Sequence, residues 1–192
     1  MRHLTPDHYV RMPWRNGGGT TTELVVEHGG RGAMATAGAR AERFLYRVSI
    51  ADVETDGPFS RFEGYDRHIM MLSGRGMTID CGAHGVLDLA APFEPRTFSG
   101  DWDVTGTLRD GAVRDFNLIV DRARATSSLA VRPLTAPIAM TFDAGQIGII
   151  YVIAGALVNA ASGDTIVADA PIELTPRGEA RIAVATVHLN GR

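Results

Sequence analysis

The stretch RHIMMLSGRGMTI, residues 67–79, decides the fold, because a later stretch of the chain repeats its pattern. Residues 148–160, GIIYVIAGALVNA, also run as an apolar strand, turn at a glycine and continue into a second strand. Gly74 and Gly155 coincide when the two stretches are aligned. Glycine adopts positive φ without a Cβ clash, as a tight turn between paired strands requires. The repeat therefore predicts two copies of one β-barrel unit.

The rest of the chain agrees with an all-β fold. Short segments rich in β-branched and aromatic residues recur between Gly, Pro and Asp, and helical periodicity is nearly absent. The stretch 121–145 has no strong strand signal, so we expect the join there, with an N-terminal unit at residues 1–122 and a C-terminal unit at 123–192 packed against it. We expect strands at residues 20–26, 44–53, 68–72, 76–80, 112–120, 148–153, 156–160, 166–168 and 180–189.

Composition excludes several classes of function. The 192 residues carry a net charge of -3, so they lack the basic surface that holds nucleic acid or an anionic membrane, and we expect neither partner. All 19 basic residues other than histidine are arginines, which excludes Schiff-base chemistry on a lysine. Cys81 is the only cysteine, so an internal disulfide and a cysteine-cluster zinc site are excluded. The first residues lack the apolar run of a signal peptide, and we expect a cytoplasmic protein.

Two polar pairs interrupt the apolar strands. Side chains alternate between the faces of a strand, which puts Arg47 and Ser49 on one face of FLYRVSIADV (44–53) and Asp115 and Asn117 on one face of VRDFNLIV (113–120). Such residues usually face solvent on the outer side of an antiparallel sheet. If they face the lumen of a barrel instead, they form the floor of a binding site. The alternation alone leaves both interpretations open.

A glycine-rich loop precedes the first of these strands. The loop consists of Arg15, Asn16, Gly17 and Gly18, followed by Gly19. Its consecutive backbone N–H groups are able to converge on an anion. The guanidinium of Arg15 is able to donate two hydrogen bonds to a carboxylate. The same residues are equally typical of a turn that leads into the next strand. No lysine follows the glycines, so a nucleotide-triphosphate site of the P-loop kind is not expected.

Arg67 and His68 stand directly before an apolar strand. A guanidinium at Arg67 suits a carboxylate ligand, whereas an ion pair with Asp66 or Asp56 is the structural alternative. His68 is typical of a core histidine, and beside Arg67 it also suits a hydrogen-bond donor or proton carrier to a bound acid.

Three stretches in order together resemble the HutD/Ves family: PWRNGGGTTTE (13–23), YRVSIADVETDGPFSRFEGYDRHIMMLSG (46–74) and FSGDWDVTGTLRDGAVRDFNLIVDR (98–122). The resemblance covers residues 1–122, and the remainder matches only as a generic second barrel unit. It implies a two-repeat cupin barrel, that is, a bicupin with the RmlC-like jelly roll. Members called HutD are associated with histidine utilisation, so the resemblance also implies a role in that pathway.

The spacing of the histidines predicts that the barrel works without metal. Metal-dependent cupins carry a His-x-His pair, a glutamate and a third histidine, and Arg67 stands where those histidines usually lie. No two of the six histidines here are spaced as His-x-His, and no glutamate follows His68 closely. We therefore expect no metal and no cofactor. The six histidines are His3, His8, His28, His68, His84 and His188.

Histidine breakdown passes through carboxylates such as urocanate and formyl- or formimino-glutamate, so the leading hypothesis is a metal-independent protein that binds a small anionic metabolite of this class. Two alternatives stay open. One is a metal-independent isomerase, epimerase or hydrolase, with His68 as base and Tyr65 or Tyr46 as acid. The other is a structural or interaction protein whose strand edges favour a homodimer. No catalytic residue is assigned, and the predicted binding residues are Arg15, Asn16, Gly17, Gly18, Arg47, Ser49, Arg67, His68, Asp115 and Asn117.

Overall fold

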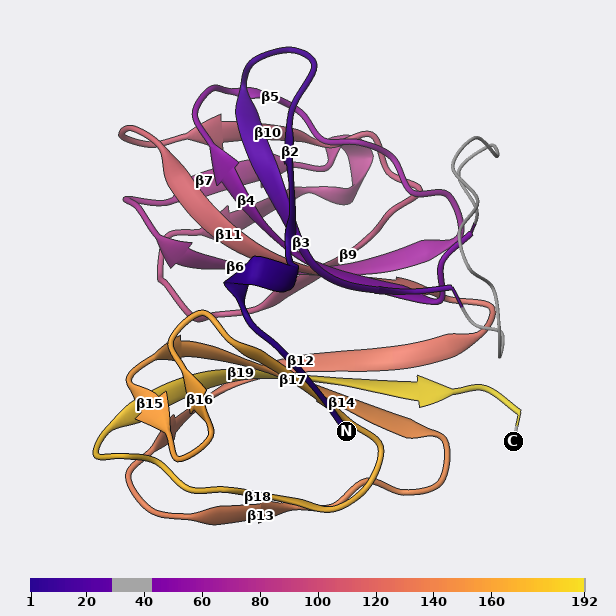
Figure 1. The fold of residues 1–192 in the computed structure, drawn as a ribbon. Helices are drawn as coiled ribbons and strands as arrows, with labels where there is room; N and C mark the ends of the chain where they lie inside the picture. The colour runs from indigo at the N-terminus through magenta and orange to yellow at the C-terminus, as the bar shows by residue number, and fades with distance from the viewer. Residues whose placement is uncertain (29–42, 192) are drawn as a thin grey trace.

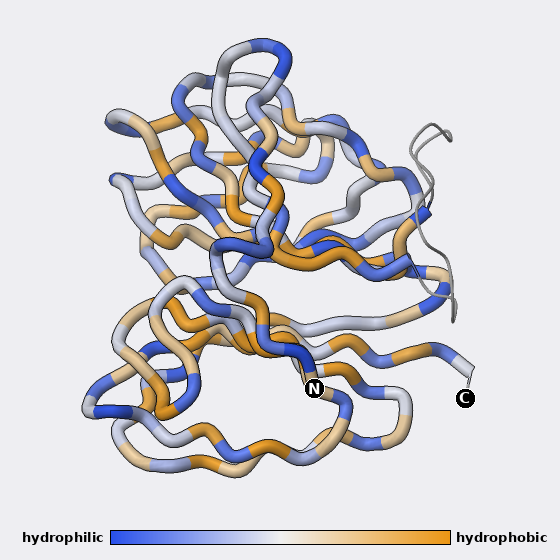
Figure 2. Tube along the Cα trace, in the orientation of Figure 1, coloured by the Kyte–Doolittle hydropathy of each residue, from blue (hydrophilic) through white to orange (hydrophobic). Residues whose placement is uncertain are grey.

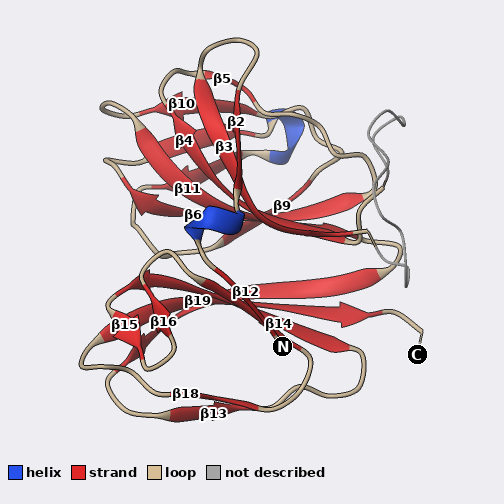
Figure 3. Ribbon diagram, in the orientation of Figure 1, coloured by secondary structure: helices blue, strands red, loops and turns tan. Residues whose placement is uncertain are grey.

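Strands account for nearly all of the regular structure in the computed structural model, which describes residues 1–28 and 43–191 (Figures 1 and 3). The only helices among these residues are two three-residue 3-10 turns, η1 (Pro6–His8) and η2 (Gly82–His84). Neither could cross a membrane, because both are far too short and polar to span its apolar layer.

Strands β2 to β11 build the first half of the molecule, the upper half in Figure 1. A six-stranded sheet has the order β2-β3-β4-β11-β6-β9, and a four-stranded sheet has the order β5-β10-β7-β8. Apolar side chains such as Met71, Met77 and Val113 form one buried cluster within this half. The strands are β2 (Val10–Pro13), β3 (Gly19–Glu27), β4 (Tyr46–Val53), β5 (Gly57–Pro58), β6 (Tyr65–Ser73), β7 (Met77–Asp80), β8 (Val86–Leu89), β9 (Arg96–Ser99), β10 (Thr105–Leu108) and β11 (Val113–Asp121).

The second half, below it in Figure 1, contains the C-terminal strands together with the first strand of the chain. Its main sheet has the order β1-β17-β14-β19-β12. Strand β1 therefore pairs with β17, far along the chain, and not with the strands that follow it in sequence; Arg2 lies opposite Val167. Two short pairs, β13 with β18 and β15 with β16, complete this half. The strands are β1 (Arg2–Leu4), β12 (Ala125–Leu134), β13 (Ile138–Met140), β14 (Gln146–Ala154), β15 (Ala156–Leu157), β16 (Ala160–Ala161), β17 (Thr165–Ala168), β18 (Ile172–Leu174) and β19 (Ala180–Leu189).

The two halves share an apolar cluster. Figure 2 shows apolar residues along the strands of both halves, and one buried cluster joins Phe116 and Leu118 of β11 to Ile149 of β14 and Val187 of β19. Because successive side chains point to opposite sides of a strand, the residues between them on β11 face the interior of the first half instead. Strands β4, β6 and β11 therefore have one face against the second half and one face in the interior of the first.

The expected strands are all observed, but several other strands were not expected, among them β1, β2, β8, β9 and β10. Each of the nine predicted segments overlaps a strand, and both aligned glycines adopt positive φ, +107° at Gly74 and +77° at Gly155. The absence of a strand in residues 121–145 was a wrong expectation, because β12 spans ten of them and β13 three more. Serines and Pro133 weaken the β signal of β12, and the structure accepts them because β12 lies at the edge of its sheet.

Candidate anion-binding site

A cavity of about 450 Å³ opens into the first half of the molecule. Its floor comes from the inward faces of β4, β6 and β11, and its rim comes from the β2–β3 loop and from the loop after β5. Polar, cationic and aromatic side chains meet here, whereas the neighbouring cluster in the same half is apolar. The lining residues are Pro13, Trp14, Arg15, Asn16, Thr21, Arg47, Ser49, Ala51, Pro58, Phe59, Ser60, Phe62, Arg67, Asn117 and Ile119.

Arg67 on β6 is the most deeply placed cation of this cavity, with 4% of its surface exposed. Its Nη1 donates to the backbone carbonyl of Ser60 (3.2 Å) and its Nη2 to Oδ1 of Asn117 (3.0 Å), while its buried Nε has no hydrogen-bond partner. Burial lowers the pKa of Arg67 to about 10, so the side chain remains a cation at neutral pH. The guanidinium carbon lies 4.8–5.4 Å from the ring centres of Phe59, Phe62 and Phe98.

The ion pair considered for Arg67 from the sequence is not formed with either candidate. Oδ1 of Asp66 accepts from Nε of Arg122 (2.7 Å), and Oδ1 of Asp56 accepts from the backbone N–H of Leu108 (2.8 Å). Arg67 therefore keeps its charge in the cavity without a carboxylate in direct contact among the described residues.

Arg47 on β4 supplies a second, half-buried guanidinium. Its Nε is also buried without a hydrogen-bond partner, and its guanidinium carbon lies 5.0 Å from the ring centre of Phe62 and 5.6 Å from that of Phe44. Burial lowers the pKa of Arg47, and the charge of Glu23 opposes that shift. Phe62 thus contacts both cations, and Ser49, two residues further along β4, lines the cavity beside them.

Asp115 and Asn117 on β11 connect the cavity to the interior. Asn117 lines the cavity, and its Nδ2 donates a short hydrogen bond to Oδ1 of Asp115, while its Oδ1 accepts from Arg67. Asp115 is completely buried, and its Oδ2 has no partner. Burial raises the pKa of Asp115 to about 7, although the charge of Arg67 and the hydrogen bond from Asn117 oppose the shift. Both polar pairs expected from the strand alternation therefore face inward.

The glycine-rich loop forms part of the rim through Arg15 and Asn16 only. The backbone N–H of Gly17 donates to the carbonyl of Trp14 (3.0 Å), and that of Gly18 donates to Oδ1 of Asn16 (3.1 Å). These N–H groups are used within the turn between β2 and β3, and Gly17 has the positive φ (+71°) that such a turn needs. The structure favours the turn interpretation for both glycines, neither of which lines the cavity.

His68 lies outside the cavity, because its side chain leaves β6 on the opposite face from Arg67. Its Nε2 is 2.9 Å from Oγ of Ser127 on β12, and its Nδ1 is 2.9 Å from Oγ1 of Thr97 on β9. Burial lowers the pKa of His68. Neither tyrosine considered as a partner acid lines the cavity: the hydroxyl of Tyr65 donates to the carbonyl of Phe44 (3.0 Å), and Tyr46 packs in the cluster between the halves.

The sequence analysis missed the contact of the two phenylalanines after β5 with the cations. Phe59 and Phe62 place ring faces against the guanidinium of Arg67, where the ring quadrupole attracts a cation. The signal available in the sequence was the pair of aromatic residues three positions apart, shortly before the strand that carries Arg67 and His68.

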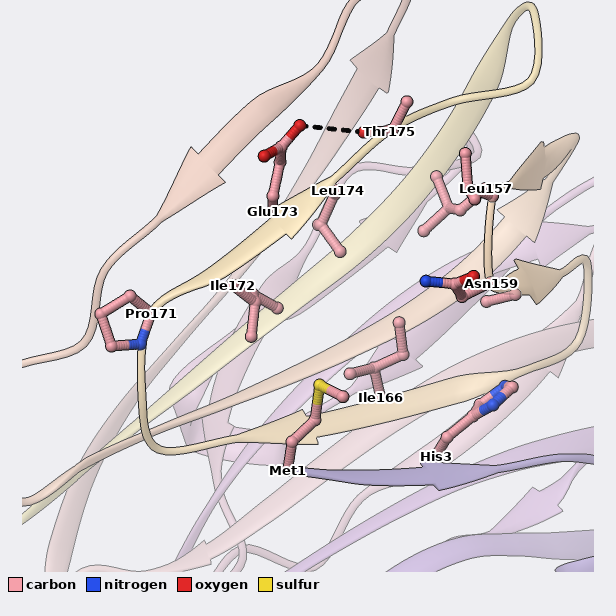
Figure 4. Close-up of a pocket in the computed structure, with 12 residues that line it drawn as sticks. Met1, His3, Leu157, Asn159, Ile166, Pro171, Ile172, Glu173, Leu174 and Thr175 are labelled. Carbon is pink, nitrogen blue, oxygen red and sulfur yellow. Dashed lines mark hydrogen bonds between the residues drawn. The ribbon is translucent and has the colours of Figure 1, made fainter.

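A second cavity of about 450 Å³ lies in the other half (Figure 4). Its wall is largely apolar, with Leu157, Ile166 and Ile172, and its carboxylate, Glu173, accepts a hydrogen bond from Thr175 (3.2 Å). No arginine is among the residues that line it. The electrostatics therefore make the first cavity the candidate site for an anion. In the described ranges, no three His, Cys, Asp or Glu side chains gather as a metal ion would require.

Comparison with known proteins assigns the family. The model of the HutD family matches residues 6–188. The uncharacterized 21.2 kDa protein in the hutC 3′ region of Pseudomonas putida is 41% identical over 116 residues, which are 60% of this chain and 56% of that protein. Protein Ves of Citrobacter koseri is 31% identical over 150 residues, 76% of this chain and 71% of that protein.

Solved structures agree with this assignment. The structure of HutD from Pseudomonas fluorescens SBW25, in a formate condition, superposes with a TM-score of 0.78 at 29% identity and covers 99% of both chains. An oxalate decarboxylase of Lactobacillus farciminis (TM-score 0.66, 10% identity, 97% of this chain and 85% of that chain) shares only the fold, which is the two-repeat cupin barrel. The chain is an all-β bicupin, and it belongs to the HutD family.

Proposed function

We propose that the cavity around Arg47 and Arg67 binds a small carboxylate metabolite without a metal ion, and that this binding serves histidine utilisation. The observation that carries the proposal is the pair of guanidinium groups, each with a buried Nε that has no hydrogen-bond partner, at one cavity. A buried cation with an unused donor is costly unless a counter-charge satisfies it. A carboxylate supplies both the charge and the acceptor oxygens.

The shape of the site also supports a carboxylate ligand. Arg67 is held by Ser60 and Asn117 and packed among three phenylalanine rings, so its planar donor group has a fixed direction. A fixed guanidinium pays little additional entropy when it binds a two-oxygen acceptor. The aromatic rings of Phe59 and Phe62 line the cavity with apolar surface, and a less polar surrounding strengthens the electrostatic interaction with the ligand.

The pathway assignment rests on the family. HutD of P. fluorescens was solved in a formate condition, and formate is the smallest carboxylate. The metabolites that we propose are urocanate and the formyl- or formimino-glutamate class, which all carry carboxylates. We place the binding in the cytoplasm, where a free buried thiol such as that of Cys81 stays reduced.

Isothermal titration calorimetry with urocanate, N-formyl-glutamate, N-formimino-glutamate and formate tests the proposal. We expect at least one of these carboxylates to bind the wild type. Arg67→Met weakens the affinity for that ligand by roughly 30-fold or more, since loss of one partner of a buried charged hydrogen bond costs about 2–5 kcal/mol. Arg67→Lys restores only part of the affinity, because an ammonium lacks the two-pronged contact.

The matched control is Arg114→Met. Arg114 lies on β11, is exposed, and pairs with Asp52 (2.6 Å) outside the cavity, so its loss leaves binding unchanged. Binding by Arg67→Met as tight as that of the wild type would refute the assignment of the cavity.

A further inference from the structure

The buried carboxyl group of Asp115 has no role in the proposed contact between ligand and arginine. Asp115 does not line the cavity, but a single residue connects it to the cavity cation: Asn117 donates a hydrogen bond to Asp115 and accepts one from Arg67. Its Oδ2 is buried without a partner, and none of its surface is exposed. A carboxylate in that position is stabilised chiefly by positive charge nearby, since it has neither water nor a full set of donors.

The positive charge comes from the same arginines that face the cavity. Arg67 on β6 attracts the Asp115 carboxylate, and Arg47 on β4 lies close enough to act on Arg67. Asp52 on β4 repels the Asp115 carboxylate and pairs with Arg114 on β11 itself. Glu23 on β3 acts on Arg47.

The other described strands around Asp115 contribute apolar side chains. Across the interior, Met77 and Ile79 of β7 belong to the apolar cluster, and His68 of β6 leaves the strand on the opposite face. The cavity and its surroundings therefore hold the guanidinium groups of Arg47 and Arg67 near two carboxyl groups, with Asp115 acting on Arg67 and Glu23 acting on Arg47.

We propose that an anion in the cavity binds together with a proton, which the carboxyl group of Asp115 takes up. This inference rests on the proposed function, because it concerns the same site. An anion beside Arg67 offsets the positive charge that keeps Asp115 ionised. It also places a second negative charge near the buried carboxylate of Asp115. Protonation of Asp115 removes that repulsion and leaves the arginines free to act on the ligand. The geometry thus makes binding of the anion proton-coupled.

The sign of the pH dependence follows from this coupling. In the free protein, burial brings the pKa of Asp115 to about 7, so the carboxyl group is partly ionised at neutral pH. A bound anion raises that pKa further, and one nearby charge typically shifts a pKa by about 1–3 units. The complex therefore holds more protons than the free protein, and affinity falls as pH rises. A shift of one unit gives about fivefold weaker binding at pH 8 than at pH 6.

The probe is sodium formate, which is fully ionised between pH 6 and 8 and brings no proton of its own. The ¹³C resonance of the Asp115 carboxyl group gives the pKa of Asp115 in wild-type protein with and without formate, and the Nε–H resonance of Arg67 reports whether formate is bound. We expect the pKa of Asp115 to rise when the Arg67 resonance shifts. An unchanged Asp115 titration while the Arg67 resonance moves overturns the inference alone. If neither resonance responds to formate, the inference and the binding site fall together.

Asp115→Asn separates charge from structure. Asparagine cannot take up a proton, so formate affinity of this variant changes less than twofold between pH 6 and 8 and at pH 8 exceeds that of the wild type. Asp164→Asn is the matched control, because Asp164 is a buried aspartate of the other half, bonded to His3 (2.9 Å), and its loss leaves the pH dependence intact. A pH dependence in Asp115→Asn equal to that of the wild type contradicts the inference, and the wild-type ¹³C titration decides it even if the variant does not fold.

Discussion

At the scale of the residue, Arg67 and His68 show how one step along a strand separates two environments. Arg67 points into the cavity of the first half, and His68 points toward the second half, with its two ring nitrogens held by Ser127 on β12 and Thr97 on β9. Because side chains alternate along β6, one of the two had to leave the cavity. The neighbouring positions of the two residues therefore carry no information about a shared function.

His68 makes the stability of the folded protein depend on pH. Burial depresses the pKa of His68 below its ordinary value of 6.5, so between the two values the unfolded chain binds more protons than the folded one. The contribution of neutral His68 to stability is present above pH 6.5 and is lost as pH falls through the pKa of the folded state. Urea unfolding between pH 5 and 7.5 measures it: the wild type loses stability on acidification more steeply than His68→Gln.

The control for this measurement is His84→Gln. His84 is exposed and stacks on Trp102 with ring centres 4.1 Å apart, far from the contacts of His68. Its substitution leaves the slope of stability against pH as in the wild type. Parallel curves for the wild type and His68→Gln would contradict the role assigned to His68.

Much of the site could be predicted from the sequence at this scale. Alternation along two apolar strands put Arg47 with Ser49 and Asp115 with Asn117 on one face of each strand, since a strand period of two fixes which residues share a face, but it left open whether that face was inward. The partners of Arg67 could not be predicted, because they come from the carbonyl of Ser60 and from Asn117, 50 residues away, and depend on the path of a loop. The same limit applies to the rings that pack on its guanidinium.

At the scale of the element, the same glycine turn recurs in the two halves, although the strands that it joins are not paired with each other as the sequence predicted: β6 and β7, and likewise β14 and β15, lie in different sheets. Gly74 follows β6 and Gly155 follows β14, each with positive φ, and the pairing register shifts at the adjacent end of both strands, at Arg114/Asp115 and at Val152/Ala154. The turn was predictable because glycine and its flanking apolar residues are local. Strand β12 was not, since its residues become a strand only through ten pairs with β19.

The turn glycine of the first half has a packing role beyond its φ. A Cβ at Gly74 would lie 2.9 Å from the Cα of Val113 and 3.0 Å from the carbonyl of Ala112, whereas a Cβ at Gly111, with φ +73°, meets no atom within 4 Å. Both substitutions to alanine carry about 1–2 kcal/mol of backbone strain. We expect Gly74→Ala to lose a further 1–3 kcal/mol or so through overpacking, as measured by chemical denaturation. Equal losses in the two variants would show that the close approach carries no energy.

At the scale of the whole molecule, the shared cluster predicts that the two halves unfold together. Both tryptophans, Trp14 and Trp102, lie in the first half, so their fluorescence reports on that half alone. Ile150 is completely buried in the cluster confined to the second half. Ile150→Ala removes about 2–5 kcal/mol from the free energy of unfolding, and the cluster containing Phe116 and Val187 transmits the loss to the first half.

Denaturation followed by tryptophan fluorescence and by far-ultraviolet circular dichroism checks this expectation. The two transitions of Ile150→Ala should coincide, both at lower denaturant concentration than those of the wild type. The control is Val86→Ala, because Val86 is exposed at 63% on the edge strand β8 and leaves both midpoints in place. A fluorescence midpoint unmoved by Ile150→Ala would mean that the halves unfold independently.

The pairing of β1 with β17 has a consequence for when the second sheet forms during synthesis. The residues of β1 are translated long before their partners on β17, Thr165 to Val167. Until β17 has been translated, β1 has no strand to pair with. The free edge of β17 is then covered when β1 pairs with it. Contacts across such a separation form slowly. The nascent chain therefore completes this edge of the second sheet only after β17 has been synthesised, when residues translated early pair with residues translated much later.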